Sequence, residues 1–356
     1  MLKQVMNITI LFMIVFSYSS LVFAGDFLLG SSWESGEVKD TVMSFDFDDV
    51  NHNYVHDIVY CSHDKIVVSE FGDNKLKVLA QKKAGMKTQF HRVTIGDWDE
   101  DGTKEILING FIRSRAYSWL YRIENNQFVL EQEFEALVMP LTFHQKEQLY
   151  SQQMSGKWQW ASAIQKMGLQ QGKWAKLDEV IKVNHGIGGH APSLYAATTY
   201  NDFIVSLRDD NKLIMRDKQG KKTWLSSMNY GGSADYIDMK ETDALGLVKQ
   251  ERFLLPPRMR VQQNELMVVK NNSYLNDFVG NVPNVKSSQI VTLAKMRVGF
   301  QEKKITSRLP GVITDIKIVD LNMDGIDEAM VSFLIKKAGY LDAYAGYTSV
   351  LAVINL

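Results

Sequence analysis

The sequence predicts an all-β fold, a single β-propeller of four-stranded antiparallel sheets, on three observations. Short apolar strands separated by polar turns follow one another along most of the 356 residues. An aspartate-rich loop between two apolar strands recurs at 97–105, at 320–328 and, altered, at 49–57. The strands group into units of roughly 40–50 residues, as propeller blades do. Six blades fit best, and a seventh is the alternative if the segment 234–250 contains strands.

The segment 1–24 predicts a signal peptide. Lys3 gives a basic start, an apolar run covers 8–16, and Val22-Phe23-Ala24 fits a cleavage site. Cleavage would leave a propeller domain at 25–356 in the periplasm or outside the cell. The alternative is an N-terminal anchor that stays attached. We expect no membrane span in the mature chain, because no later segment is apolar enough.

Composition narrows the range of partners. The formal net charge of -1 excludes a strong general attraction to nucleic acid or to acidic membranes. A 45% share of apolar and aromatic residues is enough for a sizeable core. The single Cys61 cannot form an internal disulfide, and its place in the apolar run Ile58-Val59-Tyr60-Cys61 predicts a small buried side chain.

The first two units share one pattern: a strand, the aspartate-rich loop and three more strands. The first unit predicts strands at 42–47, 58–61, 65–71 and 76–81. The second predicts them at 93–96, 105–111, 116–124 and 127–134. The turn Glu124-Asn125-Asn126-Gln127 lies between two alternating strands, as a hairpin requires.

The third unit, at about 139–183, has lost the acidic loop. It holds Trp158, Trp160 and Trp174, and its segment 161–167 has some helical character. Clustered aromatic side chains favour a wedge between blades, because large aromatics are usually buried. A sugar-stacking platform is the alternative.

The fourth and fifth units are predicted from strand spacing alone. After the glycine-rich connection 184–190, strands of the fourth unit are expected at 193–198, 203–207, 212–216 and 222–227. Those of the fifth are expected at 259–261, 265–270, 289–297 and 301–309. Two insertions interrupt the pattern: a charged segment at 234–250 and a polar excursion at 271–288.

The sixth unit contains the loop at 320–328 and an apolar strand at 348–356. The N-terminal segment 26–33 is a spare strand that could pair there. We expect this pairing of N- and C-terminal strands to close the ring, since closure removes exposed sheet edges.

The recurring loop predicts a Ca²⁺ site. In Asp-x-Asp-x-Asp-Gly-x-x-Glu, carboxylates at alternate positions supply the oxygen ligands that Ca²⁺ requires. Gly102 permits the positive φ of a sharp turn. The loop at 49–57 has Tyr54 in place of the glycine and asparagine in place of two carboxylates, so weaker metal binding or a solvated polar turn is expected. An EF-hand would carry Glu at the twelfth position, where these loops have Ile108 and Val331 within apolar strands.

These loops resemble the FG-GAP/VCBS-type repeat, the Ca²⁺-binding propeller unit of integrin α-subunit heads. The chain also resembles single-propeller exported bacterial proteins with no defined activity, an impression to which Leu254-Leu255-Pro256-Pro257-Arg258 contributes. The family implies ligands at the first, third, fifth and ninth loop positions, with a backbone carbonyl at the seventh. The implied ligands are Asp97, Asp99, Asp101, the Thr103 carbonyl and Glu105, then Asp320, Asn322, Asp324, the Ile326 carbonyl and Glu328. The corresponding weaker set is Asp49, Asn51, Asn53, Val55 and Asp57.

The sequence shows little sign of catalysis. It lacks a Gly-x-Ser-x-Gly elbow, a phosphate-binding Gly-x-x-x-x-Gly-Lys-Ser/Thr loop and a His-Glu-x-x-His helix. His185 and His190 flank the glycine-rich connection, where a transition-metal pair is the alternative to ordinary loop histidines. The other five histidines have no ligand spacing and are His52, His56, His63, His91 and His144.

We therefore expect an exported, non-enzymatic scaffold of the cell envelope that binds a protein or glycan partner and uses Ca²⁺ structurally. Partner binding is expected in the third unit and in the insertions 234–250 and 271–288. The alternative is a propeller enzyme or lectin that uses the central funnel. That alternative requires acidic, basic or aromatic side chains converging from the first strands of several blades.

Overall fold

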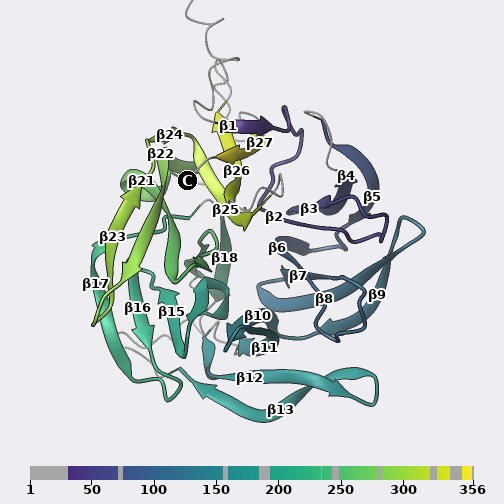
Figure 1. Cartoon of the computed structure of the whole chain (residues 1–356), viewed down its shortest axis with the longest axis horizontal. Helices are drawn as coiled ribbons and strands as arrows, with labels where there is room; N and C mark the ends of the chain where they lie inside the picture. Colours follow the sequence, from purple (N-terminus) through teal and green to yellow (C-terminus); the bar gives the residue numbers. More distant parts are fainter. Residues whose placement is uncertain are drawn as a thin grey trace, which may run out of the picture.

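The computed structural model is a ring of antiparallel sheets around a central axis (Figure 1). It describes residues 31–70, 75–154, 159–183, 193–233, 235–242, 248–279, 282–320, 327–336 and 347–354. Within these residues the only helical turn is η1 (Leu194–Ala196). Within the same residues, no helix has the length and apolar character needed to cross a membrane.

Six blades form the ring, and each contains a four-stranded antiparallel sheet. Blade 1 consists of β2 (Ser44–Asp48), β3 (Asp57–Ser62), β4 (Lys65–Glu70) and β5 (Lys77–Lys83). Blade 2 consists of β6 (Thr88–Gly96), β7 (Glu105–Ile112), β8 (Arg115–Glu124) and β9 (Gln127–Phe134). Blade 3 consists of β10 (Leu137–Phe143), β11 (Lys146–Met154), β12 (Trp160–Gln170) and β13 (Lys173–Lys182).

The other three blades complete the circle. Blade 4 consists of β14 (Ala197–Tyr200), β15 (Phe203–Leu207), β16 (Lys212–Arg216) and β17 (Lys222–Asn229). Blade 5 consists of β20 (Arg260–Gln262), β21 (Glu265–Val279), β22 (Val282–Lys295) and β23 (Phe300–Ile305), with the short β24 (Leu309–Pro310) paired to β22. Blade 6 consists of β25 (Val312–Val319), β26 (Glu328–Lys336), β27 (Tyr347–Ile354) and β1 (Ser31–Glu34).

Blade 6 joins the two ends of the described chain, as the sequence predicts. β1 pairs antiparallel with β27, with Trp33 opposite Val353 and Glu34 opposite Ala352. The chain then passes Val38, which bridges to Ser349, and enters blade 1. Closure of the ring turns the inner edge of each blade toward the centre and leaves the outer strand as the edge at the rim.

Burial follows the position of a strand within its blade. Every residue of β3 is buried, and so is all of β7 except its last residue. The outer strands β5, β9, β13, β17 and β23 lie at the rim and are largely exposed (Figure 1). They carry many charged side chains, which oppose edge-to-edge pairing with another chain.

The predicted turn between β8 and β9 is also confirmed: Asn125 and Asn126 have φ of 51° and 59°, as a tight hairpin turn requires.

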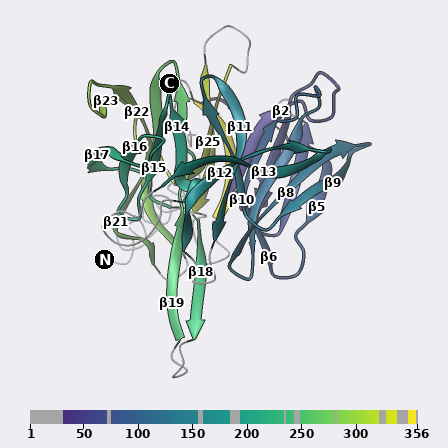
Figure 2. The same ribbon diagram turned by 90° about the horizontal axis from the view of Figure 1, so that it is seen from below.

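Two sequence expectations need correction. The segment 161–167, in which we noted helical character, lies inside the eleven-residue strand β12. The charged segment 234–250, which we described as an insertion, contributes to a hairpin of β18 (Asp235–Thr242) and β19 (Val248–Leu255). This hairpin projects from one face of the ring (Figure 2). It forms a two-stranded sheet, so the blade count is six and the seven-blade alternative is wrong.

The polar excursion 271–288 also contains regular structure. Its described parts extend β21 and β22 as a long ladder in which Asn271 faces Ser288.

In blade 3, Trp160 is 3% exposed and packs in a core that includes residues of blades 2, 3 and 4. This agrees with a wedge between blades and leaves no exposed platform at Trp160. Trp174 is partly buried in a neighbouring core, and Trp158 lies outside the described residues. Cys61 is fully buried, as predicted.

Candidate functional site

The acidic loop of blade 2 connects β6 to β7 and is folded by its own side chains. Asp97 Oδ2 accepts the N–H of Gly102 at 3.1 Å, and Asp101 Oδ1 accepts that of Thr103 at 2.7 Å. Asp99 Oδ1 accepts the N–H of Asp101 at 3.2 Å. Gly102 has φ of +88°, so the positive φ expected at this turn is confirmed.

The four carboxylates of this loop converge. Asp97, Asp99, Asp101 and Glu105 each offer an oxygen, and these oxygens lie within 4.8 Å of one another. Glu105 is fully buried at the start of β7, where its Oε2 accepts the Trp98 N–H at 3.0 Å. Asp97 Oδ1 is buried and has no hydrogen-bond partner among the described residues. A hard cation fits this donor set, because it would satisfy an oxygen that the protein leaves unpaired.

Arg122, on β8, reaches into the loop from the neighbouring strand. Its guanidinium lies 2.6 Å from Asp99, 2.9 Å from Asp101 and 3.0 Å from Glu105. It thus supplies positive charge to carboxylates that are also the candidate metal ligands. The site still favours protonation of Glu105: burial, with Asp99 beside it, raises the pKa of this carboxyl to about 7. Sequence spacing did not indicate Arg122, because it comes from the second strand after the loop.

The altered loop of blade 1 has the same hydrogen-bond skeleton. Asp49 Oδ2 accepts from Tyr54 at 2.9 Å, Asn51 Oδ1 from Asn53 at 3.1 Å, and Asn53 Oδ1 from Val55 at 2.8 Å. Asp57 Oδ2 accepts the N–H of Val50 at 3.3 Å, as Glu105 does from Trp98. Burial, with Asp49 nearby, raises the pKa of Asp57 to about 6. Four bonds therefore correspond one to one between the two loops.

Backbone angles strengthen the correspondence. His52 and Tyr54 have φ of 58° and 63°, and Glu100 and Gly102 at the same loop positions have 62° and 88°. Tyr54 therefore holds the conformation for which glycine is best suited, with a side chain that is 98% exposed. The loss of the glycine and of two carboxylates has not changed how this loop folds.

The loop of blade 6 begins and ends in the same register. Val319 pairs with Glu328 where the loop leaves the sheet, as Gly96 pairs with Glu105 and Asp48 with Asp57. Asp320 and Glu328 therefore flank a loop of the same length. The other predicted ligands, Asn322, Asp324 and Ile326, lie outside the described residues.

A second polar cluster lies near the centre of the ring. Arg258 follows β19 in the run Leu254-Leu255-Pro256-Pro257-Arg258, and its guanidinium pairs with Asp315 of β25. It also donates to the carbonyl of Phe45 on β2 and to that of Val93 on β6, the latter at 3.0 Å. One buried side chain thus connects the first strands of blades 6, 1 and 2.

Further charged side chains near the centre are held by an ion pair or by backbone carbonyls. Lys317 Nζ lies 2.5 Å from Asp46, and Asp46 Oδ2 accepts the Ile95 N–H at 3.0 Å. Arg92 donates to the carbonyls of Tyr195 and Pro256 and lies 3.6 Å above the Tyr195 ring. Charged side chains do converge from several first strands, as the funnel alternative requires. They are held, however, by one another or by backbone carbonyls.

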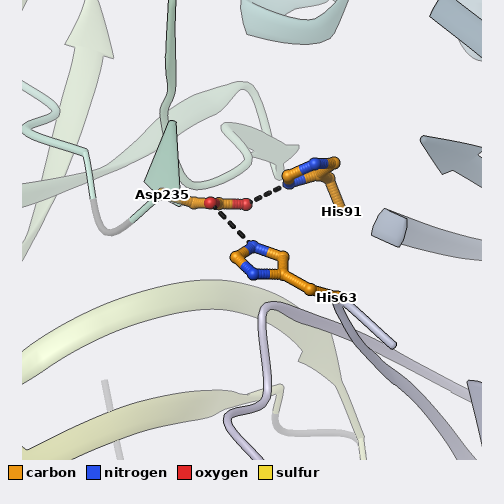
Figure 3. Close-up of side chains that lie close together, drawn as sticks. All are labelled: His63, His91 and Asp235. Carbon is orange, nitrogen blue, oxygen red and sulfur yellow. Dashed lines mark hydrogen bonds and ion pairs between the residues drawn. The ribbon is translucent and has the colours of Figure 1, made fainter. Parts of the chain in front are cut away.

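A third cluster joins His63, His91 and Asp235 (Figure 3). His63 lies in the turn between β3 and β4, His91 on β6 and Asp235 at the start of β18. The sequence shows no ligand spacing between His63 and His91, yet the fold brings them together with Asp235. Their spacing could not reveal the cluster, because Asp235 is 144 and 172 residues away from them in sequence.

The other histidines do not join a described cluster of this kind. The His56 ring packs against Phe47 in a tilted arrangement with centroids 4.8 Å apart, and the exposed His144 pairs with Asp202 at 3.1 Å. His185 and His190 lie outside the described residues, so the pair suggested for the glycine-rich connection stays a prediction.

Comparison with known proteins finds no relative by sequence and only distant similarity to solved structures. No protein-family model matches the chain, and no curated protein matches it. The chain is similar to the Dos1 propeller, with 10% identity and a TM-score of 0.41 over 88% of this chain and 68% of that one. It is also similar to BBS1N, crystallised in complex with ARL6DN, with 7% identity and a TM-score of 0.43 over 88% of this chain and 80% of that one. At this level of likeness the six sheets themselves establish the propeller.

Proposed function

We propose that this protein is an exported, non-enzymatic propeller scaffold whose acidic loops bind Ca²⁺. The observation that carries the proposal is the complete loop of blade 2, where four carboxylates converge and the buried Asp97 Oδ1 has no partner among the described residues. The proposed ligands are Asp97, Asp99, Asp101, the Thr103 carbonyl and Glu105. The resemblance to the FG-GAP/VCBS repeat supports the same assignment.

The role of the ion would be structural. Three loop carboxylates and Glu105 repel one another, and Arg122 relieves only part of this repulsion. An ion that binds the folded loop and not the unfolded chain adds its binding free energy to the free energy of unfolding. Affinities on the order of 10⁻⁴–10⁻³ M are usual for extracellular Ca²⁺ modules. The matching register of Asp320 and Glu328 supports a second site in blade 6.

The blade 1 loop is proposed as a weaker site or a metal-free copy. It has the same hydrogen bonds, but asparagines replace two carboxylates, and Asn51 Nδ2 lies 3.4 Å from Asp57 Oδ1. The Asn51 side-chain amide can thus donate a hydrogen bond to Asp57 at a place where a bound cation would otherwise contact this carboxylate. The set Asp49, Asn51, Asn53, the Val55 carbonyl and Asp57 therefore carries less negative charge toward an ion.

The buried centre supports a scaffold over a funnel enzyme or lectin. Arg258, Asp315 and Arg92 are at most 6% exposed and are bound to each other or to backbone carbonyls. A catalytic group must reach a substrate, and these groups are occupied by structural contacts. The enzyme or lectin alternative is favoured only by the convergence of the charges.

For the partner, we propose that a protein or glycan of the cell envelope binds the parts that depart from the blade pattern. The β18–β19 hairpin projects from one face (Figure 2), and a projecting hairpin offers backbone and side chains that the ring itself does not use. The segment 1–24 supports export to the periplasm or the cell exterior. Mass spectrometry of the secreted chain should find an N-terminus at Gly25, and an intact Met1 would contradict cleavage.

The metal proposal is tested by thermal unfolding with elemental analysis. Chelation should lower the Tm of the full chain, and Ca²⁺ should restore it. The variant Asp99→Ala should lose part of this response, because one loop of at least two is affected. Asp210→Ala removes an exposed turn carboxylate outside the loops and is the matched control. An unchanged melt after thorough chelation, with no bound metal detected, would overturn the proposal.

The partner proposal is tested by capture from native cell envelope in the presence of Ca²⁺. A variant in which residues 239–251 are replaced by a short turn keeps Asp235 and shortens the hairpin. It should melt like the parent and lose a partner that the parent retains. Equal capture by both proteins would exclude the hairpin as the binding element.

A further inference from the structure

The cluster of His63, His91 and Asp235 fastens three separate elements together. Asp235 lies at the root of the projecting hairpin, His63 comes from a turn of blade 1, and His91 from the first strand of blade 2 (Figure 3). Asp235 Oδ1 is 2.9 Å from His63 Nε2, and Asp235 Oδ2 pairs with His91 Nδ1. The two imidazole rings are 4.8 Å apart, centroid to centroid.

We propose that His63 Nε2, His91 Nδ1 and the Asp235 carboxylate bind Zn²⁺ or a similar borderline transition-metal ion. Two imidazole nitrogens and one carboxylate are a known ligand set for zinc, with a fourth position left for water. This ion differs in class from Ca²⁺, which takes oxygen ligands, and the site is remote from the acidic loops. It would hold the hairpin root to blades 1 and 2.

The geometry suits such an ion. Zinc ligands at about 2.0–2.2 Å in a tetrahedral arrangement lie roughly 3.4 Å from each other. The three donor atoms lie within 4.8 Å of one another, so a small outward shift from the hydrogen-bonded arrangement would admit the ion. His63 can make this shift, since its side chain is 38% exposed and lies in a turn. The same exposure gives the ion a path from solvent.

The state of His91 is a second and independent observation. The side chain is fully buried, and its Nε2 has no hydrogen-bond partner among the described residues. Without metal, the Asp235 carboxylate accepts the hydrogen bond at Nδ1 and so holds the proton there. Metal binding at Nδ1 would move this proton to Nε2 or release it, and no described group competes for Nε2.

Burial of the carboxylate is a further observation. The Asp235 side chain is 7% exposed, so a bound divalent cation would face a carboxylate that is largely removed from water.

The test is metal titration of the full chain with Zn²⁺ and with Co²⁺, in saturating Ca²⁺. We expect one Zn²⁺ per chain and a visible Co²⁺ absorption of tetrahedral type. His63→Gln is the primary variant, because its half-exposed turn position should tolerate the change. It should weaken Zn²⁺ binding by more than about 100-fold, beyond the loss typical of an outer-shell substitution. Asp235→Asn should do the same, with circular dichroism confirming that both variants fold.

Matched controls separate this site from other histidines and from the acidic loops. His144→Gln removes an exposed histidine that also pairs with an aspartate, and it should leave Zn²⁺ binding unchanged. The double variant His185→Gln/His190→Gln and the loop variant Asp99→Ala should also bind normally. Absence of Zn²⁺ binding, binding that His63→Gln does not weaken, or binding lost in His144→Gln or in the double variant would each overturn the proposal.

Discussion

Arg258 and Asp315 form an ion pair at the centre of the ring, and their side chains are 6% and 1% exposed. The pair does not stand alone, because Arg258 also binds the carbonyls of Phe45 and Val93. Asp315 Oδ2 in turn accepts from Ser44 Oγ and from the Phe45 N–H. Three first strands that are distant in sequence are thereby held to a single guanidinium. Arg258, which lies between the hairpin and blade 5, thus connects the first strands of three blades.

Asp315→Asn should destabilise the fold strongly. The substitution leaves Arg258 buried without its countercharge, and breaking one partner of such a pair costs about 3–5 kcal/mol. Urea unfolding would measure this loss. Asp210→Asn is the control, because Asp210 pairs with Arg208 at 3.1 Å on the surface, where an ion pair contributes little. If the Asp315→Asn protein were as stable as the parent, the Arg258–Asp315 pair would not have the structural role proposed for it.

The same ion pair predicts how the free energy of unfolding depends on pH in acid. Burial alone would raise the pKa of Asp315, but Arg258 outweighs burial and holds this pKa below its ordinary value of 3.8. A lowered pKa in the folded state stabilises the fold at all pH values above 3.8, and the effect is lost as pH falls through the folded-state value. The stability gap between parent and Asp315→Asn should stay constant from pH 7 to 5 and narrow below about pH 4. A gap that narrows already at neutral pH would exclude this explanation.

Local patterns in the sequence predicted the blades, the turns, the closing strands and the loops. Apolar periodicity and loop spacing are short-range signals, and they carry this information directly. The helical character noted in 161–167 was misleading, because pairing of β12 with β11 and β13 overrides the preferences of individual residues. The seven-blade alternative was wrong because the insertion supplies only two strands. Among the described residues, β18 and β19 pair with each other and do not form a four-stranded blade.

The central pair and the histidine cluster could not be predicted from spacing. Arg258 and Asp315 are 57 residues apart, and His63 and Asp235 are 172 apart. One signal was present in the sequence: Asp46 lies between Phe45 and Phe47, and Asp315 lies within another apolar strand. A charge inside an apolar strand requires a partner, although the sequence does not say which one.

Trp160→Ala should act on stability and not on glycan recognition. The side chain is 3% exposed and packs on Phe253 of β19, with ring centroids 5.5 Å apart. Loss of a large buried aromatic costs about 3–5 kcal/mol, so a clear fall in Tm is expected. Glycan-array binding by the parent that disappears in a still-folded Trp160→Ala protein would instead favour the sugar-platform alternative.

Arg122→Gln should distinguish the contribution of the Arg122 guanidinium from that of the proposed Ca²⁺ ion at the blade 2 loop. Without the guanidinium, Asp99, Asp101 and Glu105 repel one another more strongly in the metal-free protein. We expect the chelated variant to melt lower than the parent by about 2 °C, in keeping with a partly exposed network. Ca²⁺ should then raise its Tm by more than it raises that of the parent, since a competing cation has been removed.

Arg115→Gln is the control for this experiment, because Arg115 lies exposed at the far end of β8. It should leave both Tm values unchanged. An equal response to Ca²⁺ in the parent and in Arg122→Gln would show that Arg122 does not compete with the ion.

The two homologous turn positions predict opposite effects of substitution. Gly102 has φ of +88° and open space around the position of a side chain, so Gly102→Ala meets only the backbone penalty. That penalty is about 1 kcal/mol for a residue held in the left-handed region. Tyr54 has φ of 63° and an exposed ring, so Tyr54→Gly relieves the same penalty. Because glycine also loosens the unfolded chain, the net gain should be only about 0.5 kcal/mol. Urea unfolding of both variants in excess chelator would measure these changes without metal effects. If both substitutions destabilise the protein equally, the two loops do not share the conformation described above.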